Sequence, residues 1–141
     1  RLRNNPTDIP AMVEEALRWD PPIQCTFRRV TRDDELEGVG VKKGDMVIPM
    51  WAGANWDPAV FLNPEQFNID RPMTKPHMGF GFGPHFCAGA ELARIEARIA
   101  FEELLSRLGN ITLDGRASDL THLPSFASHG YRKVGLQFEA L

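Results

Sequence analysis

The sequence predicts a mainly α-helical fold with a small β region. Two stretches, 5–20 and 88–108, carry apolar residues at helical spacing. Strand-like segments are short and lie at 22–31, 39–50, 111–113 and 134–138. Between the hairpin-like segment and the second helix lies an irregular region, 57–79, rich in proline and asparagine. Such a long irregular stretch is uncommon inside a compact domain.

Composition places the chain among globular proteins and excludes several classes. It has 141 residues, of which 43% are hydrophobic and 25% charged, enough for one domain with a core. The net charge of −3 offers no basic surface, so nucleic acid is not an expected partner. No apolar run approaches the roughly 18 residues of a membrane helix, so no membrane segment is expected in this chain. Two cysteines, Cys25 and Cys87, do not make a disulfide framework.

The first helix is predicted over 5–20, with Thr7 or Asp8 as its cap. Its apolar stripe consists of Met12, Val13, Ala16 and Leu17. On the same helix Glu15 and Arg18 lie three residues apart and therefore share a face. Taken alone, such a pair is usually an exposed ion pair that contributes under about 1 kcal/mol.

Strands are predicted next, at 22–31 and as a hairpin over 39–50. Alternation along the first strand places Arg28 and Arg29 on opposite faces, with Arg29 in solvent. In the hairpin, Val39 and Val41 are expected to pair with the segment 46–48 across a turn at 42–45.

A Gly-rich loop at 80–89 runs straight into the second helix, which Gly109 and Asn110 are expected to end. Its glycines allow positive φ and a close approach to a flat partner. Cys87 lies where the helix begins, and the free N–H groups and helix dipole there stabilise a thiolate. The residues leave two interpretations open: a small buried hydrophobe in a turn, or a thiolate ligand of haem iron.

The same loop resembles the haem-binding loop of the cytochrome P450 family, Phe-Gly-x-Gly-x-His/Arg-x-Cys-x-Gly. The fixed positions are matched by Phe80, Gly81, Gly83, His85, Cys87 and Gly89. The resemblance implies haem b (iron protoporphyrin IX) as the cofactor, with Cys87 as the catalytic axial ligand of the iron and His85 hydrogen-bonded to a propionate. Histidine at this position is typical of the soluble bacterial members, which implies a cytoplasmic location.

Other segments extend the resemblance. Glu15 and Arg18 are similar to the family's Glu-x-x-Arg signature, a buried structural pair, and Arg71 is expected to complete the set. Gln66 stands where many members have that third arginine. Arg28 resembles the arginine that meets a haem propionate. Trp56 stands where the family commonly has arginine.

The resemblance begins just before the family's helix K. Residues 1–141 are therefore expected to be the C-terminal haem-ligating portion of a single cytochrome P450 domain: helix K, a β hairpin, the meander, the Cys-ligand loop, helix L and the C-terminal strands. By the same resemblance, the residues expected to border the substrate are Ile23, Gln24, Cys25, Thr26 and Phe126.

The implied activity is oxidation, typically hydroxylation, of an apolar small molecule by O2, with electrons from a ferredoxin and its reductase or a similar donor. Arg94 and Arg98 form either a solvated face of the second helix or a docking patch for an acidic ferredoxin. Alternatives are a peroxide-driven enzyme or isomerase of the same fold, a haem-binding protein without turnover, and an inactive remnant. The isolated chain, which lacks the family's oxygen-activating helix, is expected to be inactive.

Overall fold

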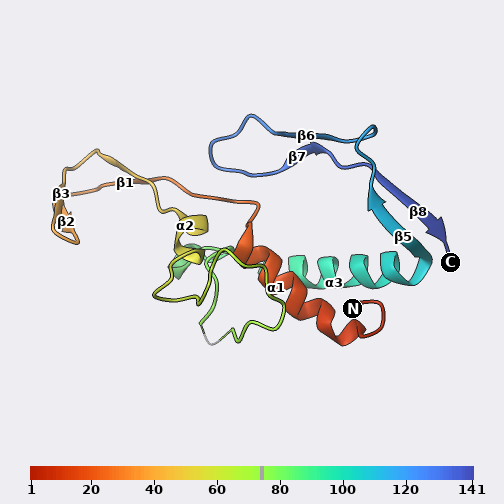
Figure 1. The fold of residues 1–141 in the computed structure, drawn as a ribbon. Helices are drawn as coiled ribbons and strands as arrows, with labels where there is room; N and C mark the ends of the chain where they lie inside the picture. The colour runs from red at the N-terminus through yellow and green to blue at the C-terminus, as the bar shows by residue number, and fades with distance from the viewer. Residues whose placement is uncertain (74) are drawn as a thin grey trace.

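The computed structural model describes residues 1–73 and 75–141. Two helices, α1 (Ile9–Trp19) and α3 (Ala90–Arg107), lie side by side, and two-stranded antiparallel ladders extend from them on both sides (Figure 1). A third, short helix, α2 (Trp51–Asn55), lies beside the end of α1. The sequence did not predict α2.

Helix α1 confirms the first predicted helix, but its start differs. The residues Pro6–Asp8 form a 3₁₀ turn, and the α-helical part begins only at Ile9. Asp8, one of the two predicted caps, occupies the N-cap position of α1 but makes no capping hydrogen bond through its side chain, and the Thr7 hydroxyl donates to the Asn5 side chain at 2.8 Å. The helix stops at Trp19 because two prolines follow Asp20.

The core lies between α1 and α3. Ile9, Met12 and Val13 of α1 are buried. The partly buried apolar residues around them are Leu2, Ala16, Leu17, Ile69, Ala97 and Leu105. The contact is made by the apolar stripe that the sequence predicted for the first helix. On α3, by contrast, Leu92, Ile95 and Ile99 are exposed in this chain.

The predicted hairpin within 39–50 is wrong in its pairing. Strand β3 (Val39–Val41) pairs with β2 (Asp34–Leu36), and β4 (Met46–Val47) pairs with β1 (Arg28–Arg29). Glu37 and Gly38, at φ +46° and +81°, make the two-residue turn that joins β2 to β3. The turn at 42–45 therefore leads away from β3. The predicted strand over 22–31 is regular only at β1, with isolated bridges at Ile23 and Cys25.

The C-terminal region forms two further ladders. Strand β5 (Leu108–Leu113) pairs with β8 (Leu136–Ala140), which confirms two predicted strands with shifted bounds. The structure adds β6 (Asp119–His122) and β7 (Tyr131–Lys133), which the sequence did not predict. Helix α3 ends at Arg107, before the predicted Gly109, because the chain turns directly into β5.

The loop between β6 and β7 returns to the segment that follows α1. The Gln24 N–H donates to the Ala127 carbonyl at 2.8 Å, and the His129 N–H donates to the Pro22 carbonyl at 2.8 Å. These bonds bring the C-terminal part of the chain beside the residues that form one wall of the cavity described below.

Candidate functional site

The Gly-rich loop is closed on itself by backbone geometry. Gly81 and Gly83 have φ of +75° and +76°, a region that favours glycine. Between these turns and α3, the Cys87 N–H donates to the Phe80 carbonyl at 3.0 Å. The Cys87 carbonyl in turn accepts the N–H of Ala90, the first residue of α3, at 3.2 Å. The loop and helix thus hold the Cys87 backbone from both sides.

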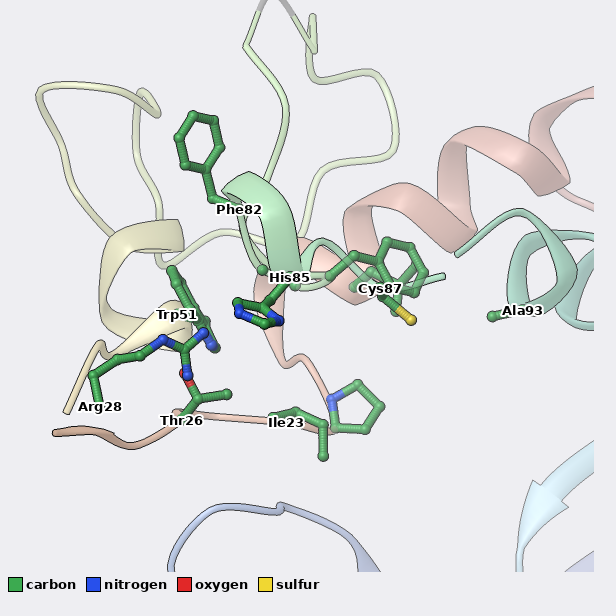
Figure 2. A pocket seen from close by; sticks show the side chains of 13 residues that line it. Ile23, Thr26, Arg28, Trp51, Phe82, His85, Cys87 and Ala93 are labelled. Atoms are coloured by element: carbon green, nitrogen blue, oxygen red, sulfur yellow. The ribbon is translucent and has the colours of Figure 1, made fainter. Parts of the chain in front are cut away.

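The Cys87 side chain is exposed and faces a largely apolar cavity with a volume of about 390 Å³. Figure 2 shows its sulfur pointing away from the loop. The cavity is lined by Leu17, Pro22, Ile23, Thr26, Arg28, Trp51, Gly79, Phe80, Gly81, Phe82, His85, Cys87 and Ala93. Segments that are far apart in the sequence therefore share one wall.

Two polar side chains capable of binding anions, Arg28 and His85, reach the same cavity (Figure 2). Arg28 comes from β1, where its Nη1 donates to the Phe27 carbonyl at 2.9 Å. The neighbouring Thr26 hydroxyl is buried and has no hydrogen-bond partner within the described part of the chain. An exposed thiol and two anion-binding side chains among apolar walls suit a flat apolar ligand that carries acidic groups.

The structure brings only part of the predicted substrate set into the cavity. Ile23 and Thr26 line it. The Gln24 amide donates to the Asp20 side chain and the Pro21 carbonyl, and Cys25 is buried at 1% exposure; neither lines the cavity.

Phe126 also lies outside the cavity wall, and its ring centroid is 6.1 Å from that of Phe27. Gly83 and Gly89 shape the loop rather than line the cavity. A Cβ on Gly89 would lie 3.9 Å from the Cys87 sulfur.

Glu15, Arg18 and Arg71 meet in a buried cluster away from the cavity. Glu15 and Arg18 are 0% exposed, and Arg18 Nε lies 2.8 Å from Glu15 Oε2. Arg71 Nε lies 3.1 Å from the same oxygen. Burial acts to raise the pKa of Glu15, but hydrogen bonds from Arg18, the Asn68 N–H and Arg71 outweigh it and lower that pKa.

Several cavity residues were missed by sequence reasoning, among them Leu17, Trp51, Gly79 and Phe82. Trp51 begins α2, and nothing in its local sequence marks it as a wall residue. The sequence predicts Leu17 only as part of the apolar stripe of the first helix.

None of the described helices is long and apolar enough to cross a membrane. Within 1–73 and 75–141, no group of three or more His, Cys, Asp or Glu side chains is arranged to hold a metal ion. A metal at Cys87 would therefore need its remaining ligands from another group.

Comparison with known proteins gives consistent results. Residues 8–127 match the family model described as cytochrome P450. Cytochrome P450 109 from Bacillus spizizenii is 42% identical over 134 residues, which are 95% of this chain and 33% of that protein. The chain thus spans about a third of the length of this relative.

Solved structures agree in fold. The structure of cytochrome P450 CYP109Q5 from Chondromyces apiculatus superposes with a TM-score of 0.91 at 35% identity, covering 99% of this chain and 36% of that one. CYP109E1 from Bacillus megaterium in complex with corticosterone gives a TM-score of 0.90 at 36% identity, covering 97% and 36%. The predicted fold, mainly α-helical with a small β region, is confirmed.

Proposed function

This chain belongs to the cytochrome P450 family, and we propose that it forms the haem-ligating part of a haem-thiolate monooxygenase. The proposed reaction is oxidation, typically hydroxylation, of an apolar small molecule by O2. One observation carries the proposal: the exposed Cys87 sulfur faces an apolar cavity that Arg28 and His85 also line.

The residues present fit a haem group. Cys87 supplies a single soft ligand, and no described set of side chains would complete a metal site without a porphyrin. Arg28 and His85 are suited to hold propionate carboxylates, Arg28 through the planar fork of its guanidinium. Positive φ at Gly81 and Gly83 folds the loop close to the cavity without side chains that would fill it. When bound, haem iron supplies the oxygen-activating chemistry, and thiolate donation to it favours O–O cleavage.

The protein's own contribution is ligation and orientation of the bound group. The hydrogen bond from the Cys87 N–H to the Phe80 carbonyl orients the ligand loop. Trp51, Phe80 and Phe82 provide apolar wall for the cavity that the Cys87 sulfur faces. Arg28 and His85 orient the acidic edge of the bound group. Glu15, Arg18 and Arg71 hold the segments behind the loop together and serve the fold rather than the chemistry.

The proposed electron donor, a ferredoxin with its reductase or a similar protein, is inferred from the family alone. Arg94 and Arg98 were candidates for docking an acidic ferredoxin, but each is already paired within the chain. Arg94 contacts Glu14 and Glu91, and Arg98 contacts Glu102. Because these carboxylates balance their charge, the two arginines do not support a docking patch on α3.

The substrate is proposed by chemical class. The corticosterone in the CYP109E1 structure is a rigid apolar molecule. We expect the same class to be a suitable first panel for the present protein, because Ile23 and Trp51 give its cavity an apolar wall. The test is oxygen consumption matched by hydroxylated product.

The experiment that tests the proposal uses the natural full-length protein, reduced and saturated with carbon monoxide. We expect the strongly red-shifted Soret band of thiolate ligation, and its loss in Cys87→Ser. Cys25→Ala is the matched control, since it removes the other thiol, which is buried outside the cavity wall. A band typical of histidine ligation, or no haem band at all, would overturn the proposal.

A further inference from the structure

Three charged or polar side chains from distant parts of the chain meet behind the ligand loop. Glu14 lies on α1, Arg94 on α3, and His77 in the segment that leads to the loop. Arg94 Nε donates to Glu14 Oε1 at 2.6 Å, and its Nη2 donates to Glu14 Oε2 at 3.1 Å. His77 Nε2 lies 3.1 Å from Glu14 Oε2. The Glu14 carboxylate therefore accepts two hydrogen bonds from Arg94 and a third from His77.

His77 connects this cluster to the backbone just before the loop. Its side chain is 3% exposed. The Gly79 N–H donates to His77 Nδ1 at 3.0 Å, so the ring proton is assigned to Nε2, which donates to Glu14. Both ring nitrogens are thus used, and a change at Glu14 is passed directly to the residue that precedes Phe80.

Arg94 connects the cluster to the loop itself. Its Cζ lies 4.7 Å from the centroid of the Phe80 ring, in a cation–π contact. The Phe80 ring also packs against His77, at 5.8 Å, and Phe86, at 6.3 Å between centroids. The Phe80 carbonyl accepts the Cys87 N–H. Phe80 therefore contacts Arg94 through its side chain and Cys87 through its carbonyl.

We propose that Glu14, His77 and Arg94 act as one set of positioning residues, which hold Phe80 so that the Cys87 sulfur keeps the geometry of a thiolate ligand. This inference rests on the proposed function and adds residues to the same site. Of the three, none lines the cavity, so each acts through Phe80 or Gly79. Loss of the Arg94 guanidinium frees the Phe80 ring and weakens the hold on the acceptor of the Cys87 N–H.

Helix α3 supplies a matched control one turn further on. Arg98 pairs with Glu102 through Nη1 at 3.2 Å and is 44% exposed. It has the same chemistry as Arg94 but makes no contact with an aromatic ring of the loop among the described residues. Arg94→Gln and Arg98→Gln therefore remove the same charge from the same helix, with only the first touching Phe80.

The experiment compares these two variants in the full-length haem protein. The readouts are the ferrous–CO spectrum and the reduction potential. For Arg94→Gln we expect loss of most of the thiolate-type band and a shifted potential, with partial rescue in Arg94→Lys. Arg98→Gln is expected to keep the wild-type band and potential. Glu14→Gln, which preserves shape but weakens both contacts, is expected to fall between wild type and Arg94→Gln.

A further control variant separates a positioning role from a general loss of stability. Trp56→Phe removes the hydrogen bond from the Trp56 indole to the Trp19 carbonyl, which involves neither Phe80 nor Cys87, and is expected to keep the thiolate-type band. A wild-type spectrum in Arg94→Gln would overturn the inference, as would equal band loss in Arg94→Gln, Arg98→Gln and Trp56→Phe. If the wild-type protein itself lacks the thiolate-type band, the proposed function fails instead.

Discussion

Arg71 and Glu15 meet across 56 residues of sequence, with Arg71 Nε 3.1 and 3.2 Å from the two Glu15 carboxylate oxygens. Both side chains are almost wholly buried. Arg71 also donates to the carbonyl of Gln66, at 2.8 Å, as does Arg18, at 3.1 Å. Position 66 is therefore used through its backbone, which explains why glutamine is tolerated there.

This contact predicts a large cost for Arg71→Ala. The substitution leaves Glu15 as a buried carboxylate with one guanidinium instead of two, and removing one partner of a buried pair costs roughly 3–5 kcal/mol. The free energy of unfolding in denaturant measures it. The control is Arg107→Ala, which breaks an exposed pair with Glu103 and is expected to cost under about 1 kcal/mol. Equal costs for both variants would contradict the structural role of Arg71.

Glu14 predicts a specific loss of stability in acid. The hydrogen bond from His77, together with the Arg94 guanidinium, lowers the pKa of Glu14 from 4.5 to about 2 against the opposing effect of burial. Because the folded pKa lies below the unfolded value, Glu14 stabilises the fold above pH 4.5, and this contribution is lost as pH falls toward 2.

The test compares wild type with Glu14→Gln from neutral pH to about pH 3. The charged and titratable groups that face Glu14 are His77 and Arg94, and Glu91 shares Arg94. We expect the difference in unfolding free energy between the two proteins to shrink over the acid end of this range. Parallel curves throughout would show that the ionised Glu14 carboxylate does not contribute.

Gly79 predicts a strict size limit where the loop segment crosses α1. A Cβ at this position would lie 2.7 Å from the Leu17 carbonyl oxygen, which is helix backbone and cannot rotate away. We expect Gly79→Ala to cost about 1–3 kcal/mol and to weaken haem retention through gel filtration. Gly40→Ala is the control, because nothing lies within 4 Å of a Cβ there. Full haem retention by Gly79→Ala would contradict the prediction.

The Trp56 side chain is expected to stabilise the fold through a hydrogen bond at the end of α1. Its indole Nε1–H donates to the carbonyl of Trp19, the last residue of α1, at 2.7 Å, and the two rings lie 6.0 Å apart. Trp56 thus satisfies a helix-end carbonyl, which gives a physical reason for tryptophan where the family commonly has arginine. Trp56→Phe keeps most of the ring contact and is expected to cost about 1 kcal/mol. An unchanged denaturation midpoint would contradict this.

Local sequence patterns predicted where helices and strands lie better than which strands pair with each other. The apolar stripe around Met12 and Val13 is present in α1, because helical spacing is set within a few residues. The pairing of 39–41 was mispredicted because two turns compete. The chain folds back at Glu37 and Gly38, so β3 pairs with β2, and the turn at 42–45 leads on to β4. The strands β6 and β7 are exposed throughout and carry little alternation to detect.

The ligand loop is encoded locally, since the spacing of Phe80, Gly81, Gly83 and Cys87 is short and its turns follow from glycine. The surroundings of the loop depend on tertiary packing. Arg28 and Trp51 lie 59 and 36 positions before Cys87, and Glu14 lies 80 positions before Arg94. Contacts at such separations depend on how α1, α2 and α3 pack against one another, and no short-range pattern records that packing.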